Sequence, residues 1–308
     1  MRRVITKASG FVRPNECTCI LGPSGSGKTS LLNVLSGRIS LSQGSKYDGK
    51  VIANGRPLTR DHFGQFAAFV QQDEVLLWTM TPREAFNFAQ QIRTDKSQDL
   101  IDLRTDELLH TLGLMDCADF QIGLGLRKGE KKRVSIGYEI VTEPSLILLD
   151  EPTSGLDSIS AYQIVSMLKR EARRGVTVLA TIHTPSAETF LLFDRCILLS
   201  EGHTIYNGSP HKIKDFFVEQ GFRFKKYQNL ADWLLKLAMD MKRLNPRAST
   251  TELARIQRFK YAEELIHAES IFDSFDANDF SFSTVKSERS TSNIRQFWLI
   301  FKRNMIYQ

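Results

Sequence analysis

The chain contains the segment Gly22-Pro23-Ser24-Gly25-Ser26-Gly27-Lys28-Thr29, which fits the pattern G-x-x-x-x-G-K-[ST]. An apolar run, Glu16–Leu21, precedes it and predicts a strand. The segment Lys28–Ser36 follows it, carries leucines at helical spacing and predicts a helix. A strand, a glycine-rich turn and a helix in this order are the context that a phosphate-binding loop requires, so this interpretation is favoured over a chance match.

Each residue type in this segment suits phosphate binding. Glycines let the backbone curl until its N–H groups face phosphate oxygens, and the N-terminus of the following helix directs a positive dipole at the anion. Lys28 can reach the β- and γ-phosphates of a nucleotide, and the Thr29 hydroxyl can ligate Mg²⁺. The predicted nucleotide-binding residues are Gly22, Pro23, Ser24, Gly25, Ser26, Gly27, Lys28, Thr29 and Ser30.

Two carboxylates, Asp150 and Glu151, follow the continuous apolar run Leu146–Leu149. Such a run is typical of a strand that is buried on both faces. Asp150 is suited to hold the Mg²⁺ shell, and Glu151 is suited to act as a general base on an attacking water. The alternative is that Asp150 only caps the turn after the strand, and the phosphate loop upstream favours the metal site.

Polar residues also follow two other predicted strands. Gln72 comes after Phe66–Val70, where its amide could touch metal or water. His183 comes after Val176–Ile182, where its imidazole could contact a γ-phosphate, although a lone histidine at a strand end is usually structural. These positions extend the predicted site beyond the phosphate loop.

The order of predicted elements indicates the fold class. Strands and helices alternate through the first 240 residues or so, which predicts an α/β fold with a largely parallel sheet. Residues 81–140 carry helical patterns only, and Thr81-Pro82-Arg83-Glu84 combines a capping box with proline at the first helical position. Val51–Ala53, followed by Asn54-Gly55, is typical of half a hairpin. We therefore expect a helical subdomain inserted into an α/β domain.

Composition excludes several classes of protein. With 308 residues, 42 % apolar and 25 % charged, the chain is not disordered, collagen-like or a coiled coil. Four scattered cysteines favour a reducing intracellular setting over a disulfide scaffold, and Cys17 and Cys19 fit a strand better than a metal site. The net charge of +6 permits anionic partners without choosing among them. The sequence has no apolar run of about 18 residues and no secretory signal at its start.

Several segments together carry a family resemblance. With the phosphate loop, they resemble the ATP-binding cassette (ABC) family and, in detail, its White/G-type half-transporters, from about Arg3 to about Lys236. The resemblance implies a P-loop NTPase fold with an ABC-type core, an inserted helical subdomain and a small antiparallel β subdomain. The segments are Arg133-Val134-Ser135-Ile136-Gly137, Thr153-Ser154-Gly155-Leu156-Asp157-Ser158, Thr181-Ile182-His183-Thr184-Pro185-Ser186 and Leu230-Ala231-Asp232-Trp233-Leu234.

The resemblance also implies roles for individual residues and a need for ATP and Mg²⁺. Gln72 would be the glutamine of the Q-loop, because Asp73-Glu74 behind it match the family's acidic pair. The implied catalytic residues are Glu151, His183 and Gln72. The implied Mg²⁺ ligands are Thr29, Gln72 and Asp150. The D-loop, which crosses to a partner cassette, would be Ser154, Gly155, Leu156 and Asp157.

The sequence departs from the family at the signature motif, which is usually close to L-S-G-G-E and binds the ATP held by the partner. The matching residues are Leu126, Arg127, Lys128, Gly129 and Glu130. Arg127 replaces the serine and Lys128 the first glycine, so a β-carbon hinders close approach of backbone to phosphate. We therefore expect weak hydrolysis in a homodimer and asymmetric ATP sites in a heterodimer.

The resemblance implies a domain order and partners. Residues 1–245 would form the nucleotide-binding domain, with the helical subdomain at about 81–140, residues 246–293 a linker, and residues 294–308 an amphipathic helix that leads to a transmembrane domain. The strand whose aromatic residue stacks on adenine in the family is missing before Arg3, so the chain is expected to be a fragment. The expected partners are ATP, a second half-transporter and the membrane, with the cassette on its cytoplasmic face.

The expected function is ATP hydrolysis that drives export of a lipid, sterol or other hydrophobic substrate. An ATP-binding regulatory protein with little hydrolysis is one alternative, favoured by the altered signature and opposed by the intact Glu151 and His183. A soluble ABC ATPase is the other, but the chain has neither a second cassette nor a basic patch interleaved with aromatics. We therefore expect no nucleic-acid partner.

Overall fold

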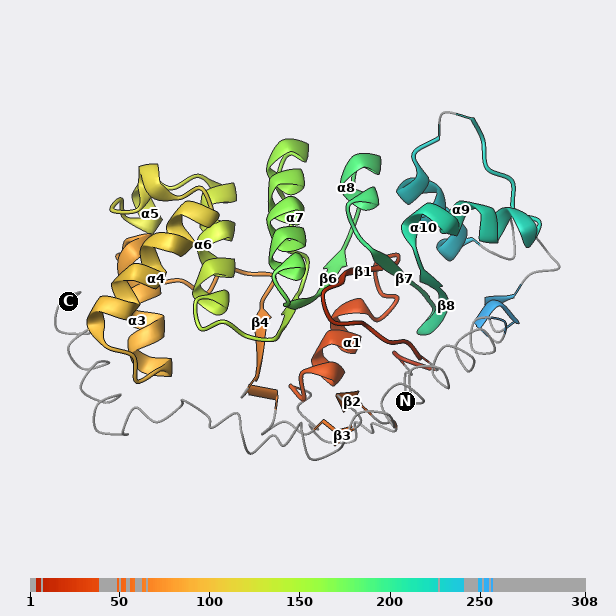
Figure 1. Cartoon of the computed structure of the whole chain (residues 1–308). Coiled ribbons are helices and arrows are strands. Elements are labelled where there is room, and N and C mark those ends of the chain that lie inside the picture. The colour runs from red at the N-terminus through yellow and green to blue at the C-terminus, as the bar shows by residue number, and fades with distance from the viewer. Residues whose placement is uncertain are drawn as a thin grey trace.

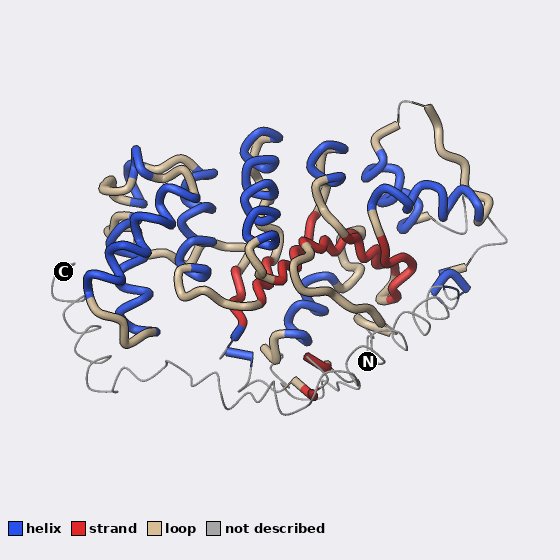
Figure 2. The backbone as a smooth tube through the Cα atoms, viewed as in Figure 1, coloured by secondary structure: helices blue, strands red, loops and turns tan. Residues whose placement is uncertain are grey.

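A six-stranded sheet runs through the centre of the molecule in the order β4-β5-β6-β1-β7-β8 (Figures 1 and 2). The computed structural model describes residues 4–6, 8–38, 49, 51–53, 56–58, 63–64, 66–226, 228–240, 249–250, 252–254 and 256. The first five strands of that order run parallel, and β8 is antiparallel to β7. The strands are β1 (Cys17–Leu21), β4 (Ala67–Val70), β5 (Leu146–Leu149), β6 (Thr177–Ile182), β7 (Arg195–Ser200) and β8 (His203–Gly208).

Helices cover both faces of this sheet. Figure 1 shows α1 on one face and α7 and α8 on the other. Because parallel strands need crossover connections, this two-sided cover is what a parallel sheet requires. The helices outside residues 81–140 are α1 (Lys28–Leu35), α7 (Ser158–Arg173), α8 (Ala187–Leu191), α9 (Pro210–Glu219) and α10 (Leu230–Met239).

Residues 81–140 form helices beyond the β4 edge of the sheet (Figure 1). The first helix begins as the sequence predicts: Thr81 accepts a hydrogen bond from the N–H of Glu84, whose carboxylate accepts one from the N–H of Thr81. The elements are α3 (Pro82–Arg93), α4 (Gln98–Thr111), the 3₁₀ turn Met115–Cys117, α5 (Ile122–Gly125) and α6 (Lys128–Ile140).

The alternation of side chains along β1 explains how the two faces are filled. Cys17, Cys19 and Leu21 point into the larger core, which continues through α7 and α8 into the helices of 81–140. Ile20 points to the opposite face, where Leu32 of α1 packs against it. Burying both faces makes the strand apolar throughout, and the two cysteines are part of that strand as predicted.

The predicted α/β class with a largely parallel sheet is confirmed, and the short pair β2 (Ile52–Ala53) and β3 (Arg56–Pro57) is antiparallel. Within the predicted linker, residues 250, 252–254 and 256 are helical. The rest of that linker except residue 249, the predicted helix 294–308 and the hairpin turn 54–55 lie outside the described residues. None of the described helices has the length and hydropathy of a membrane span.

Candidate functional site

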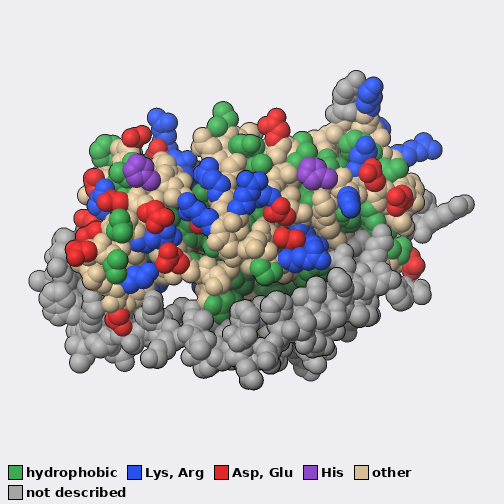
Figure 3. Space-filling model, in the orientation of Figure 1, with side chains coloured by type: hydrophobic (Ala, Val, Ile, Leu, Met, Phe, Trp, Pro, Cys, Tyr) green, Lys and Arg blue, Asp and Glu red, His purple; other side chains and the backbone are tan. Residues whose placement is uncertain are grey.

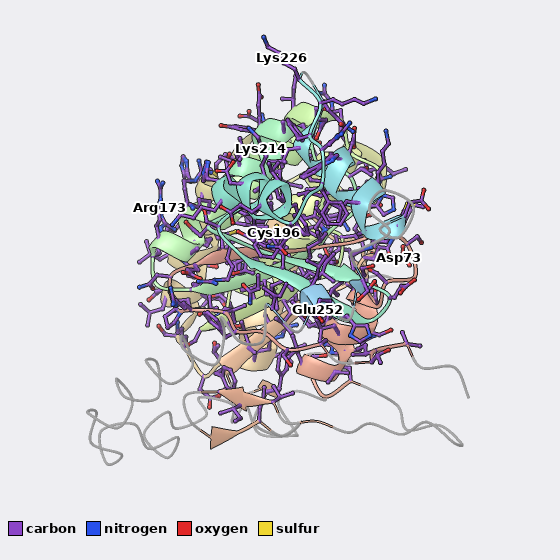
Figure 4. All side chains as sticks on the ribbon, turned by 90° about the vertical axis from the view of Figure 1, so that its right-hand side faces the viewer. Asp73, Arg173, Cys196, Lys214, Lys226 and Glu252 are labelled. Carbon is purple, nitrogen blue, oxygen red and sulfur yellow. The ribbon has the colours of Figure 1, made fainter. Side chains whose placement is uncertain are left out.

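The loops that carry the predicted site all leave one edge of the sheet. Leu21 pairs with Ile182, and Leu149 pairs with both Val70 and Ala180. Because these strands are parallel, the residues that follow them meet at their common carboxyl edge. In Figure 4, Asp73 of the loop after β4 and Arg173 at the end of α7 lie on opposite sides of the molecule, with Cys196 between them.

The phosphate loop has the backbone that its glycines allow. Gly25 and Gly27 have φ values of 80° and 100°, in the region that side chains rarely adopt. At Gly22 there is no room for a side chain, since a β-carbon would lie 2.6 Å from the carbonyl oxygen of Leu199. The loop is therefore bare backbone at the start of α1, which is the form of an anion-binding site.

The Lys28 ammonium is held inside this loop. Its Nζ donates to the carbonyl oxygen of Gly22 at 2.8 Å and to that of Pro23 at 3.3 Å. Burial lowers the pKa of Lys28, and the nearby carboxylates Glu151 and Asp150 oppose that shift. These two acceptors are neutral carbonyls, so the ammonium can also pair with a phosphate anion.

Asp150 is tied to the phosphate loop and to the neighbouring strand. The hydroxyl of Thr29 donates to Asp150 Oδ1 at 3.1 Å. The hydroxyl of Thr181 donates to the same oxygen at 2.6 Å, and Thr181 is the second-to-last residue of β6. The Asp150 side chain is buried. A buried carboxylate needs such donors, so its orientation is fixed by two strands and one helix.

Glu151 is held in an unusual backbone conformation. Its φ is 46°, a left-handed value that is rare for a residue with a side chain and that costs on the order of 1–3 kcal/mol. Its N–H donates to the Thr181 hydroxyl at 2.8 Å. Its carboxylate lies 3.3 Å from the Nε2 of Gln72, which donates to it. Gln72 thus meets Glu151 in this structure, rather than the Thr29–Asp150 pair.

The remaining predicted residues lie around this group. His183 follows β6, and its side chain is exposed. Asp157 caps α7, because its Oδ1 accepts from the N–H groups of Ile159 and Ser160. The exposed carboxylate keeps a pKa below its ordinary value because Ser160 donates to it from both N–H and hydroxyl. The predicted D-loop therefore leads directly into the first turn of α7.

The altered signature residues form the start of α6. Leu126 is buried, and Arg127 occupies the N-cap position with an exposed side chain. The N–H of Arg127 donates to Glu130 at 2.7 Å, which is half of a capping box. Arginine has no acceptor to complete it. Lys128 reaches the predicted D-loop of its own chain, since a β-carbon at Gly155 would lie 2.1 Å from Lys128 Nζ.

The residues at the sheet edge fit a Mg²⁺–nucleotide. The buried Ser26 hydroxyl has no hydrogen-bond partner among the described residues, which suits a group that faces phosphate. Thr29 and Asp150 offer one hydroxyl and one carboxylate, and proteins bind Mg²⁺ with one or two carboxylates plus phosphate oxygens. The described chain holds no cluster of three or more His, Cys, Asp or Glu side chains suited to a metal.

Comparison of the chain with known proteins identifies its family. A family model described as "ABC transporter" matches residues 5–154. Over 273 residues the chain is 39 % identical to ABC transporter G family member 13 of Arabidopsis thaliana. The aligned region covers 86 % of this chain and 39 % of that protein. The chain belongs to the ABC transporter family. Its match covers the ATP-binding cassette of that family, as the resemblance implied.

Other relatives and a solved structure agree with this assignment. The cassette is 42 % identical over 243 residues to ABC transporter G family member 14 of Arabidopsis thaliana, covering 77 % of this chain and 37 % of that protein. It is 35 % identical over 244 residues to ABC transporter G family member 1 of Dictyostelium discoideum, and this match covers 77 % of this chain and 30 % of that protein. The cassette thus spans about two fifths or less of these relatives.

The fold is also that of a solved ATP-binding cassette of an ABC transporter. The two chains superpose with a TM-score of 0.61 and 22 % identity, over 71 % of this chain and 90 % of that chain. This likeness supports the P-loop NTPase core with its mostly parallel sheet.

Two residues of the cassette's site were not predicted from the sequence. Thr181 bonds both acidic residues, yet within an apolar strand it looks like an ordinary β-branched residue. Lys132 is buried and donates to the carbonyl oxygen of Gln72 at 2.6 Å. Lys132 lies one helical turn from the buried Ile136, but no local pattern in α6 indicates the loop that it contacts.

Proposed function

We propose that this chain is the ATP-hydrolysing motor of a G-type ABC half-transporter. The observation that carries the proposal is the linked set at the sheet edge: Lys28 in the phosphate loop, Asp150 bonded to Thr29, and Glu151 bonded to Gln72. Binding groups, a metal site and a general base thus adjoin one loop.

Glu151 acts as the general base in this proposal. Lys28 and the N–H groups of residues 22–30 hold the phosphates of ATP, and His183 contacts the γ-phosphate. Water attacks the γ-phosphorus, the bond to the bridging oxygen breaks, and ADP leaves with the electron pair. Glu151 takes the proton of that water, and Gln72 orients the carboxylate. Mg²⁺, held by Thr29, Asp150 and Gln72, would neutralise charge on the phosphates.

Hydrolysis in this family requires two cassettes, and the signature residues decide how this chain pairs. In our proposal Leu126, Gly129 and Glu130 keep the frame of the motif, while Arg127 and Lys128 remove its serine and first glycine. The chain then hydrolyses ATP well only when a partner supplies a normal signature. The other site, built from this chain's signature, holds ATP more than it hydrolyses it.

The transport partner is a membrane domain, with the cassette on the cytoplasmic face. Four exposed apolar side chains beside the Q-loop support the proposal that a partner docks there. Their exposed fractions are 73 % for Val75, 63 % for Trp78, 57 % for Phe120 and 90 % for Leu124. Patches of this kind commonly mark interaction sites. The substrate class we propose is a lipid, sterol or other hydrophobic molecule, as in the White/G-type resemblance.

The test of this proposal compares ATP turnover of the full-length protein alone and with co-expressed half-transporters. We expect low turnover alone and a rise with a partner whose signature is normal. The double variant Arg127→Ser/Lys128→Gly should raise turnover of the protein alone. If the unaltered homodimer turns over at the rate of the restored one, the asymmetric-site proposal is wrong.

A second candidate is an ATP-binding regulatory protein, favoured by the Arg127–Lys128 pair alone. It predicts ATP binding without turnover under every pairing, including that with the restored signature. The linkage of Gln72 to Glu151 is the observation against it, because a chain that only binds ATP has no need of an oriented base.

A further inference from the structure

Lys132 lies in the second turn of α6, and its side chain is only 2 % exposed. Burying an ammonium group is costly unless hydrogen bonds and an opposite charge compensate it. Its Nζ donates to the backbone carbonyl oxygen of Gln72 at 2.6 Å and lies 3.6 Å from a carboxylate oxygen of Glu74. Gln72 and Glu74 both belong to the loop that follows β4.

That loop has no helix or strand of its own to fix its shape. Residues 71–79 form no helix or strand, and Gln72 itself is exposed. Its side chain nevertheless meets Glu151 at 3.3 Å. A flexible segment pays conformational entropy to present one side chain in one orientation, and the bond from Lys132 fixes the backbone at the residue that makes the contact.

The contacts form one chain from α6 to the general base. Lys132 holds the carbonyl of Gln72, and the amide of Gln72 holds the carboxylate of Glu151. One turn earlier on the same helix, Lys128 lies against Gly155, in the loop that follows Glu151. The helix that starts at the signature therefore touches the loops on both sides of the base.

We propose that Lys132 is a positioning residue for ATP hydrolysis, which holds Gln72 against Glu151 and thereby couples the signature helix to the general base. The proposal rests on the function proposed above, with Glu151 as that base. Lys132 touches neither ATP nor the attacking water. Its effect is on the orientation of the groups that do, and small displacements of such groups are costly in rate.

The experiment measures steady-state ATP turnover and equilibrium ATP binding of the full-length protein with its partner. Lys132→Met keeps the length of the side chain and removes the charge. We expect kcat to fall about tenfold or more and KM to change less than about threefold, the pattern of an interaction lost only in the transition state. Lys132→Arg, which can still donate to Gln72, should recover most of kcat.

Two controls separate positioning from general stability. Lys169→Met removes a lysine of α7 that is less deeply buried than Lys132 and pairs with the carboxylate of Asp194. It should lower the thermal midpoint and leave kcat unchanged where the protein is folded. In a Gln72→Ala background, Lys132→Met should lower kcat by less than about twofold further, because effects that act through one another are not additive.

The outcomes distinguish the two proposals. Turnover of Lys132→Met at the unaltered rate, or an equal loss of kcat with and without the Gln72 side chain, overturns the positioning role. If Lys132→Met does not fold, the same cycle is run with Lys132→Gln, which lacks the charge and is one atom shorter, and strictly additive effects overturn the positioning role. Unchanged turnover of Glu151→Gln instead overturns the proposed function, whatever Lys132 does.

Discussion

Thr181 donates its hydroxyl to Asp150 and accepts the N–H of Glu151 with the same oxygen. The backbone of Glu151 is left-handed, a conformation that is strained for a residue with a side chain. One hydroxyl on the neighbouring strand compensates this strain and satisfies a buried carboxylate. At the residue scale, the orientation of both acidic groups depends on Thr181.

Thr181→Val tests this dependence. The change removes one of the two hydroxyls that donate to Asp150 and the acceptor of the Glu151 N–H, and the free energy of unfolding should fall by about 1–3 kcal/mol. ATP turnover should fall as well. Urea denaturation and an ATPase assay check both.

Thr18→Val is the matched control for that experiment. Thr18 is also fully buried in the central sheet, but its hydroxyl has no hydrogen-bond partner among the described residues. Its replacement should be neutral or stabilising. An equal loss in the free energy of unfolding for both variants would show that the hydrogen bonds of Thr181 do not cause the loss.

The element scale shows what sequence patterns can predict. The strand before Gly22 and the helix after Lys28 were expected, and the structure has them as β1 and α1. Periodicity and capping signals are local, which is why they suffice there. The burial of Lys132 depends on the distant loop after β4, and no local pattern in α6 reports that loop. The role of each site residue stays a prediction until it is tested.

Arg127 gives α6 an incomplete start. Its backbone has N-cap dihedrals, φ −73° and ψ 161°, and Glu130 already accepts the N–H of Arg127. Arg127→Ser would supply the missing acceptor and complete a Ser-x-x-Glu capping box. We expect the free energy of unfolding to rise by about 1 kcal/mol. Arg127→Ala, which adds no acceptor, should give no such gain in urea denaturation, and an equal gain from alanine would contradict the capping argument.

Gly137 lets α6 approach α3 closely. A β-carbon at this position would lie 2.3 Å from Phe86 Cζ and 2.6 Å from Leu112 Cδ1. Overpacking of this kind costs about 1–3 kcal/mol, against a gain of about 1 kcal/mol in helix propensity from alanine. We therefore expect Gly137→Ala to lower the thermal midpoint. A midpoint equal to or above that of the unaltered protein would show that the helices separate without cost.

At the scale of the whole molecule, the net charge alone does not identify what the protein binds. Lys and Arg side chains gather in the middle of the face shown in Figure 3. The acidic pair lies at the carboxyl edge of the sheet beside the phosphate loop, in contact with Thr29 and Gln72. The net charge of +6 alone allowed many anionic partners. Among these anionic partners, the phosphate loop and the acidic pair at the sheet edge favour the phosphates of a nucleotide.

The central claim is that Glu151 is the base that activates water at this edge. The decisive measurement is ATP turnover of Glu151→Gln in the full-length protein with its partner, together with ATP binding. We expect turnover to fall about 100-fold or more and binding to persist, since the amide keeps the size of the carboxylate. Glu143→Gln is the control: Glu143 also has a positive φ, 57°, but pairs with Lys96 at 3.1 Å, and its change should leave turnover intact. Turnover of Glu151→Gln at the unaltered rate would contradict the account.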